Sequence, residues 1–563
     1  MSMQPALTEL PIETADSGFY RGFSQIVTIT SKLLILGLVI WAIAFPEQSG
    51  AVLNGINKFI LSSFGAWYIW TVTLFVLICI ALAIWPTAGR LKLGLPGEVP
   101  EFSNFSWFSM MFGAGIGVGM LTWAVAEPVY HFQNNPEVIM GLTNGGTEDN
   151  VRMAYKWSFL HWGLGAWACY AIAGLALGFF SYRRGLPLTM RSSLTPIFGE
   201  KLSGSVGHVV DIVAVVATIL GVAQTLGFGV EQFVSGLTRI GIGGLTNEAG
   251  TANSTGIIVA IVIIMAASTL SALSGVGKGI KWLSNLNMGL SIALLTFFLL
   301  FGSTFFGLQA LVLGVWDYLI ALPAMSFTVW SGDGVEGSVA TKLEGWQGGW
   351  SVFYWAWWIA FAPFVGLFLA RISKGRSIRE FVLGAMIVPS LMCFVWFTWA
   401  GGTAIDLTMQ QAASGEIASV KEGVIFSAPD GDKIFAMTNY MLAPISTFLA
   451  WAMSLMIVVL LMTYLVTTAD SAVLIVNTIN AAGDEGPKAR PHILFWGVAL
   501  GAVVAALLLV GGLKAIQTAM VIGALPFSLV MVLQCAALVK AIYNDGRREA
   551  AGMPTTVAAA PAE

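Results

Sequence analysis

Long apolar runs separated by short polar segments dominate the pattern along this chain. A helix needs about 20 apolar residues to cross roughly 30 Å of hydrocarbon, and this pattern predicts an all-α polytopic membrane protein. Two shorter or interrupted apolar stretches, 51–63 and 305–322, are expected to lie at the membrane interface. The twelve predicted transmembrane helices are 26–46, 66–86, 105–131, 157–181, 208–237, 255–274, 282–304, 349–370, 378–400, 443–467, 491–512 and 515–541.

The charges of the connecting segments test this topology. With the N-terminus in the cytoplasm, 18 of the 27 Lys and Arg residues fall in cytoplasmic segments and 8 fall in the opposite ones. Such an excess is the positive-inside pattern, so both termini are expected to be cytoplasmic. Residues 1–24 lack the basic-then-apolar pattern of a cleaved signal peptide.

Composition supports the same class of protein. The chain is 57% hydrophobic and only 10% charged, whereas a soluble domain carries about 25% charged residues, so membrane lipid is the expected surroundings. The net charge of −3 gives no reason to expect a nucleic-acid partner. The four cysteines lie inside apolar runs without metal-ligand or disulfide spacing. Motifs of metalloproteases and serine hydrolases are missing from the sequence, so an enzyme is not expected.

The third predicted span contains an unusual glycine run. It reads FGAGIGVG over Phe112–Gly119, and each glycine costs about 1 kcal/mol relative to alanine inside a helix. One interpretation is close helix packing through small residues. The other is an unwound stretch that lines a cavity, since irregular backbone is tolerated at that depth only where protein or water satisfies it.

The eighth predicted span offers a counterpart, because Pro363 removes a helical hydrogen bond and Gly366 loosens the next turn. Discontinuous helices in matching positions of two halves indicate an inverted-repeat transporter. The expected divisions are an N-terminal tail (1–25), two peripheral helices (26–104), a first five-helix repeat (105–304), an interfacial helix with an external loop (305–347), a second repeat (348–541) and a C-terminal tail (542–563).

Aromatic residues gather on two of these spans. On a continuous helix Trp162, Trp167 and Tyr170 lie within an arc of about 140°, and Trp358 and Phe361 lie about 60° apart. Tryptophan is also enriched at membrane interfaces, and for the deeper rings packing is the alternative. Aromatic faces at this depth favour a cage for a quaternary ammonium group.

Ionisable residues inside spans are functional candidates because they are costly in lipid. Asp211 and Glu231 belong to this group. Glu127 does too, although its place at the outer end of a span suggests contact with water, and Asp470 is expected to be a helix-end charge near the inner surface. Structural or surface roles are expected for the histidines, His131, His161, His208 and His492.

Four motifs in order resemble the betaine/choline/carnitine transporter family over nearly the whole chain, closest to its sodium-coupled betaine members. They are the glycine run, the Trp-x4-Trp-x2-Tyr spacing from Trp162, the segment WAWWIAFAPFVGLFLARISKGR (355–376) and TTADS (467–471). The resemblance implies a LeuT-like fold, in which two helices precede a five-plus-five inverted repeat. It also suggests a homotrimer in the bacterial inner membrane.

The resemblance further implies roles for single residues. Phe361 stands where the family usually has another tryptophan. Thr218 matches a threonine of a second sodium site, but the partner position holds Val222. The implied onium cage is Trp162, Trp167, Tyr170 and Trp358; the implied carboxylate-binding stretch is Gly115, Gly117 and Gly119; and the implied sodium ligands are Gly113, Ile116, Thr467 and Thr468.

The implied function is sodium-coupled import of an onium zwitterion, with no further cofactor. Choline-type members often carry an aspartate where this chain has Gly119, which favours a zwitterion with its own carboxylate. Glycine betaine leads, dimethylsulfoniopropionate is close behind, and choline uptake or ion-independent exchange are the alternatives. The short C-terminal tail, with Arg547 and Arg548 as its basic residues, predicts weak osmotic activation.

Overall fold

The computed structural model describes residues 5–115, 117–274 and 281–557. Within these ranges the regular structure is helical, and three isolated bridges are the only β contacts. The α-helices are α1 (Gln25–Ala44), α2 (Pro46–Ile84), α3 (Asn104–Gly115), α4 (Val118–Gln133), α5 (Pro136–Ile139), α6 (Val151–Trp162), α7 (Leu164–Leu177), α8 (Thr195–Phe198), α9 (Ser205–Arg239), α10 (Ser254–Ser274), α11 (Lys281–Phe301), α12 (Thr304–Phe327), α13 (Val339–Gln347), α14 (Phe353–Ile372), α15 (Ile378–Ala413), α16 (Val424–Ser427), α17 (Lys433–Leu442), α18 (Thr447–Asn480) and α19 (Arg490–Ala550).

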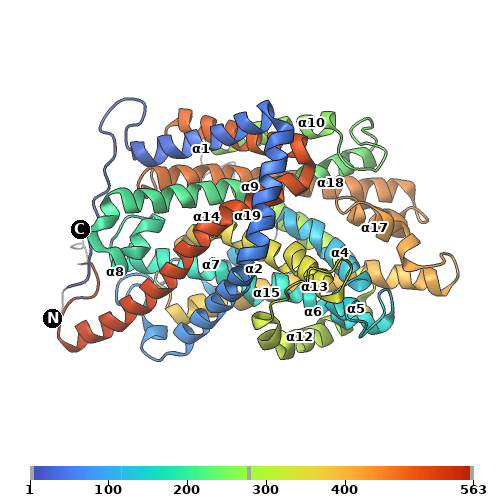
Figure 1. The fold of residues 1–563 in the computed structure, drawn as a ribbon, viewed down its shortest axis with the longest axis horizontal. Helices are drawn as coiled ribbons and strands as arrows, with labels where there is room; N and C mark the ends of the chain where they lie inside the picture. Colours follow the sequence, from blue (N-terminus) through green and yellow to red (C-terminus); the bar gives the residue numbers. More distant parts are fainter. Residues whose placement is uncertain (1–4, 116, 275–280, 558–563) are drawn as a thin grey trace.

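The helices form a bundle around α7 and α14 (Figure 1). These two pack against each other, and both also contact α19. From Gly165 to Leu177 every residue of α7 is buried, as expected for a helix that is apolar on all sides and surrounded by protein. Side chains on α7 and α14 are therefore well placed to line an internal site.

Both ends of the described chain lie at the same end of the bundle, on the left in Figure 1. Arg548, near the end of α19, donates a hydrogen bond to the carbonyl of Pro5. The short helices α5 and α17 lie toward the opposite end (Figure 1). An even number of membrane crossings would place the two termini on one side in this way.

Eleven helical segments of the described chain are long and apolar enough to cross a membrane. They confirm a polytopic all-α protein but not the count of twelve. The two halves of the third predicted span are each too short to qualify, the last two predicted spans are joined in α19, and α12 qualifies although we expected an interfacial helix there. The twelve-span count and the inverted repeat stay predictions.

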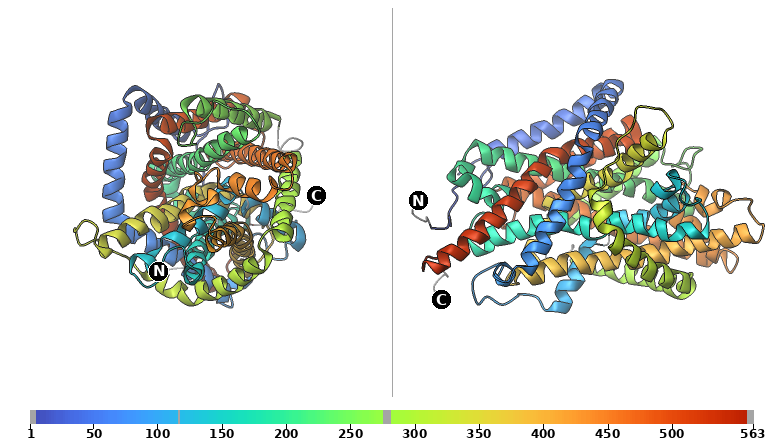
Figure 2. Two further views of the ribbon diagram at one scale, coloured as in Figure 1. Left: turned by 90° about the vertical axis from the view of Figure 1, so that its right-hand side faces the viewer. Right: turned by 60° about the horizontal axis from the view of Figure 1, so that its bottom comes forward.

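The prediction of a separate interfacial helix at 51–63 is wrong. These residues continue without interruption into the next span and form the 39-residue α2. No proline separates the two apolar stretches, so one helix can continue through both. The N-terminal half of α2 lies at the edge of the molecule in the left-hand view of Figure 2.

The third span is broken as expected, because α3 ends at Gly115 and α4 begins at Val118 after an extended Gly117. The predicted discontinuity in the eighth span is wrong. The helix α14 continues through Pro363, and the irregular part is a π-helical segment, η7 (Gly348–Val352), just before it. One missing N–H at Pro363 does not end a helix that neighbouring helices hold on every side.

Two breaks occur elsewhere. The fourth predicted span is divided at Gly163, which separates α6 from α7. The helix α19 has non-helical backbone at Gly511 and at Gly512, where φ is 63°, so this pair marks the turn between the two predicted spans. Beyond the last predicted span, 515–541, α19 continues to Ala550 and so into the predicted C-terminal tail.

Candidate functional site

An internal cavity of about 510 Å³ lies where the broken third span meets α7, α11, α14 and α18. None of the described residues that line it is charged. Its lining comprises Ser109, Met110, Gly117, Val118, Gly119, Met120, Trp162, Ala166, Trp167, Tyr170, Thr225, Ser284, Asn285, Asn287, Met288, Ser291, Trp357, Trp358, Phe361, Phe364, Val365, Phe368, Tyr464, Thr467, Thr468, Ser471 and Ile475.

The four aromatic residues of the implied cage, Trp162, Trp167, Tyr170 and Trp358, all line this cavity, and so does Phe361. The ring centroids of Trp162 and Trp358 are 5.0 Å apart and those of Trp167 and Tyr170 are 5.4 Å apart, both edge to face. Tyr170 lies 6.1 Å from Trp358 and 6.4 Å from Phe361. The rings thus meet as predicted, although the break at Gly163 means that α6 and α7 together, not one helix, present them.

Hydrogen bonds from the indole N–H groups hold three of the tryptophans in place. Trp162 donates its Nε1–H to Glu127 at 2.6 Å, and Trp358 donates to the carbonyl of His161 at 2.9 Å. Trp357, stacked on Trp358 with centroids 4.8 Å apart, donates to Thr225 at 3.2 Å. Because each of these N–H groups is bonded to the protein, the indoles are held in fixed orientations and can meet a ligand with their π faces.

The glycine run contributes backbone to the same space. Gly117 and Gly119 line the cavity, and a Cβ on Gly119 would lie 2.9 Å from Cη2 of Trp357 and 3.4 Å from Cη2 of Trp162. Gly113 and Gly115 belong to the last turn of α3. Ile116, a predicted sodium ligand, lies outside the described residues. The glycine at position 119 is therefore what lets the indoles approach the backbone.

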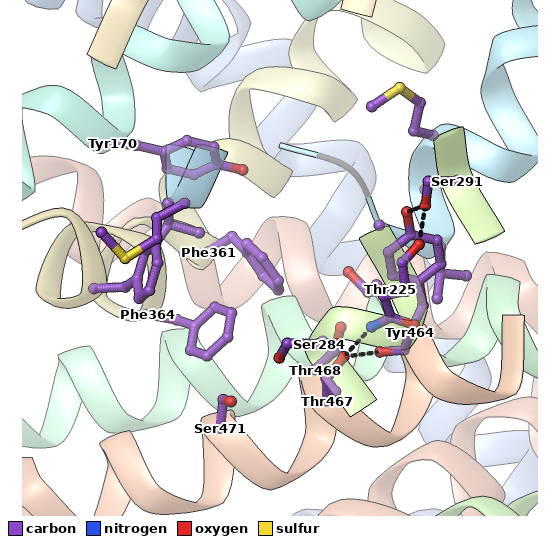
Figure 3. Close-up of a pocket in the computed structure, with 18 of the residues that line it drawn as sticks. Tyr170, Thr225, Ser284, Ser291, Phe361, Phe364, Tyr464, Thr467, Thr468 and Ser471 are labelled. Atoms are coloured by element: carbon purple, nitrogen blue, oxygen red, sulfur yellow. Dashed lines mark hydrogen bonds between the residues drawn. The ribbon is translucent and has the colours of Figure 1, made fainter. Parts of the chain in front are cut away.

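Hydroxyl groups face the aromatic rings across the cavity (Figure 3). Thr467 on α18 donates to the carbonyl of Thr463 at 2.9 Å and accepts from Nδ2 of Asn287 at 3.1 Å. The hydroxyl of Thr468 has no hydrogen-bond partner within the described ranges. Of the predicted sodium ligands, Thr467 and Thr468 thus both lie on the side of the cavity that carries the hydroxyl groups, the polar end of the cavity. Thr467 is already bonded to its own helix.

Other predicted residues lie elsewhere. Thr218 does not line the cavity, and its hydroxyl donates to the carbonyl of Ala214 at 2.7 Å. Asp211 forms an ion pair of 2.6 Å with Arg191. Glu231 accepts from the backbone N–H of Ala252 at 2.8 Å. Asp211 and Glu231 thus have structural partners, whereas the second sodium site stays a prediction.

Two expectations for carboxylates are wrong. Asp470 is not a helix-end charge, because it is buried within α18 and accepts a hydrogen bond from Ser271. Glu127 is not reached by water: its exposed fraction is 0%. His131 and His161 lie against Glu127, with nitrogen–oxygen distances of 3.3 and 2.7 Å. Sequence spacing could not show that these three residues meet, because His161 lies on a different helix.

Glu127, His131 and His161 are also the group of side chains in the described chain that could hold a metal ion, with their ligand atoms within 4.8 Å of one another. Both carboxylate oxygens already accept hydrogen bonds, however, from Trp162, Tyr354 and the two imidazoles. A metal ion would have to displace those donors, so the cluster is complete without one.

Several lining residues were not among those predicted from the sequence. Ser284, Asn287 and Ser291 are polar positions spaced by three and four on the predicted span 282–304. That spacing places them on one helix face and could have identified them. Tyr464, whose hydroxyl bonds that of Ser291, has no such signal, because a lone tyrosine in an apolar run fits packing equally well.

The cavity extends toward the end of the molecule that carries the termini. Its far lining includes Phe368, near the end of α14, and Ile475, near the end of α18. The end of α18 adjoins the N-terminal segment, because Asn480 accepts from the backbone N–H of Ser24. At the opposite end of the molecule a separate pocket of about 630 Å³ is lined by Tyr130, Trp346 and Trp350, among others.

Comparisons with known proteins identify relatives over most of the chain. The family model described as "BCCT, betaine/carnitine/choline family transporter" matches residues 26–547. A probable glycine betaine transporter of Desulfitobacterium hafniense is 36% identical over 93% of this chain and 98% of its own length. The glycine betaine transporter OpuD of Bacillus subtilis is 36% identical over 90% and 92%. The osmo-dependent choline transporter BetT2 of Acinetobacter baylyi is 36% identical over 94% and 72%.

Proposed function

This chain belongs to the betaine/carnitine/choline family of transporters, and we propose that it imports glycine betaine by sodium-coupled symport. It is a multi-pass membrane transporter and not an enzyme. We further propose that it resides in the bacterial inner membrane as a homotrimer with both termini in the cytoplasm, so that the cavity faces inward.

The observation that carries the substrate proposal is an aromatic cage in a cavity whose lining, among the described residues, contains no charged side chain. Each aromatic face attracts an onium group by about 0.5–2 kcal/mol. A net cation such as choline would be buried without a counter-charge, which is costly. A zwitterion brings its own carboxylate, and the hydroxyls and backbone N–H groups of the lining can receive it. Dimethylsulfoniopropionate also combines an onium cation with a carboxylate and is the second candidate.

Sodium coupling is supported by the oxygen atoms gathered at the polar end. The hydroxyl of Thr468 has no hydrogen-bond partner in the described part of the chain, and Thr467 beside it presents a second hard oxygen. The break between Gly115 and Val118 frees backbone carbonyls close by, which is how broken helices of transporters coordinate sodium. We propose that sodium joins the third and tenth predicted spans and thereby stabilises the conformation that binds substrate from outside.

The test is uptake of labelled glycine betaine into proteoliposomes under an inward sodium gradient or an equal potassium gradient. We expect uptake with sodium only, and loss of uptake in Trp358→Ala. Trp316→Ala is the matched control, because this tryptophan on α12 is 62% exposed and lies outside the cavity. Competition by dimethylsulfoniopropionate and by choline ranks the substrates. Equal uptake in both gradients would reject the coupling, and no uptake at all would reject the substrate.

A further inference from the structure

Glu127 on α4 is a carboxylate with four donors around it. Nε1 of Trp162 donates to its Oε2 at 2.6 Å, and the hydroxyl of Tyr354 donates to the same oxygen. Its Oε1 lies 2.7 Å from Nδ1 of His161 and 3.3 Å from Nε2 of His131. All four side chains are buried. One side chain thus joins three helices, α4, α6 and α14.

This unit also holds the second cage tryptophan. The carbonyl of His161 accepts the indole N–H of Trp358 at 2.9 Å, and Nε2 of His161 lies 3.0 Å from the hydroxyl of Ser351 in η7. Hence the orientations of both Trp162 and Trp358 depend on groups that Glu127 contacts directly. From the sequence, Glu127 was expected to contact water, and no role in the cage was predicted for it.

The same unit lies between the cavity and the pocket of about 630 Å³ at the opposite end of the molecule, which is the outer pocket in the proposed orientation. Trp350, Tyr354 and Trp358 are spaced by four residues and stack along one face, with centroid distances of 6.2 and 5.5 Å. Trp350 lines the outer pocket and Trp358 lines the cavity. Tyr354, the middle ring of this aromatic stack, is the one bonded to Glu127.

We propose that Glu127 is a positioning residue that couples assembly of the onium cage to closure of the outer passage. The proposal rests on the proposed transport function. A buried carboxylate is costly unless its oxygens are paired. If α14 moves away from α4 and α6, Glu127 loses the hydrogen bond from Tyr354 and the carbonyl of His161 loses the one from Trp358, and water entering from outside replaces both donors. The cage and the outer seal therefore form, or come apart, as one unit.

A labelling experiment tests the seal without using substrate. Ser284 lines the cavity (Figure 3), and the four native cysteines are buried, so Ser284→Cys provides a single reactive thiol. Intact cells are treated from outside with a membrane-impermeant thiol reagent. We expect slow labelling in the otherwise unchanged protein and labelling at least about tenfold faster with Glu127→Ala, since a hydrogen bond to a charged group accounts for about 1.5–3 kcal/mol.

Conservative variants separate hydrogen bonding from general damage. Glu127→Gln can still accept from Trp162 and Tyr354 while its amide donates to Nδ1 of His161, so we expect labelling close to that of the parent. Tyr354→Phe removes one donor and should give an intermediate rate even if Glu127→Ala does not fold. Glu231→Gln is the matched control, because this carboxylate bonds a loop N–H away from the cage.

Binding provides the second measurement. We expect Glu127→Ala to raise the dissociation constant for glycine betaine, measured by calorimetry on purified protein, about ten- to one-hundred-fold, and Glu127→Gln to raise it much less. Parent-like labelling in both Glu127→Ala and Tyr354→Phe would overturn the proposal, as would a glutamine variant that behaves like alanine. If the unmodified protein bound no betaine, the proposed substrate would fail, while the labelling rates would still decide the role of Glu127.

Discussion

At the scale of single residues, the site depends on how little space surrounds each indole. A Cβ on Gly119 would lie 2.9 Å from Trp357, and such overpacking costs about 1–3 kcal/mol. We expect Gly119→Ala to raise the KM for glycine betaine about tenfold by displacing Trp357 and Trp162. Gly289→Ala is the control, because no atom lies within 4 Å of a Cβ there. An unchanged KM in Gly119→Ala would mean that the indoles are not held in this arrangement.

The hydroxyl of Thr468 supports a second prediction at this scale. It faces the cavity without a partner among the described residues, so valine, which has the same shape, removes one oxygen and no packing. We expect Thr468→Val to raise the sodium concentration for half-maximal uptake about tenfold. Thr478→Val on the same helix is the control, because that hydroxyl bonds the carbonyl of Leu474 and lies outside the cavity. The same sodium dependence in both variants would exclude Thr468 as a ligand.

The aromatic residues that line the cavity were recognisable in the sequence, whereas the residues that support them were not. Trp162, Trp167 and Tyr170 are recognisable because their spacing is local. The contact of Glu127 with His161 joins two helices, and no pattern along the chain contains that information. For the same reason the polar face of α11 was visible in the sequence, but its bond from Asn287 to Thr467 was not.

At the scale of helices, breaks follow from tertiary partners as much as from residue type. Gly163 ends α6, and the next backbone N–H, that of Leu164, donates to the hydroxyl of Tyr318 on α12 at 3.0 Å. Pro363 has a stronger sequence signal than Gly163, yet α14 continues through it. Sequence alone could therefore place the helices but not decide which of them would be interrupted.

The hydrogen bond between the Leu164 N–H and the Tyr318 hydroxyl leads to a prediction about the break between α6 and α7. Tyr318→Phe removes the hydrogen-bond partner of the Leu164 N–H at a partly buried position, which costs up to about 1–3 kcal/mol. We expect a lower denaturation temperature of the purified protein and a weaker affinity for betaine, because α7 carries Trp167 and Tyr170. Tyr543→Phe, at a side chain that is 57% exposed, should change neither. Equal stability of the two variants would show that the break does not depend on Tyr318.

At the scale of the whole molecule, the cavity and the termini share one end. If that end is cytoplasmic, as the basic residues predict, Ser471→Cys should react with an impermeant thiol reagent in inside-out vesicles and much more slowly from outside. Asn144→Cys, in the loop between α5 and α6, should show the opposite preference. Sodium with glycine betaine should slow the reaction at position 471. The reverse pattern at both positions would invert the proposed orientation.

The closed outer passage has an electrical consequence. In the proposed orientation the cavity opens to the cytoplasm and brings the cytoplasmic potential up to the aromatic rings, so most of the membrane voltage would fall across the short barrier formed by Trp350, Tyr354 and Glu127. Moving one elementary charge through the full field changes the free energy by about 2.3 kcal/mol per 100 mV. The voltage sensitivity of transport should therefore arise when a sodium ion passes this thin barrier, and hyperpolarisation should accelerate that step.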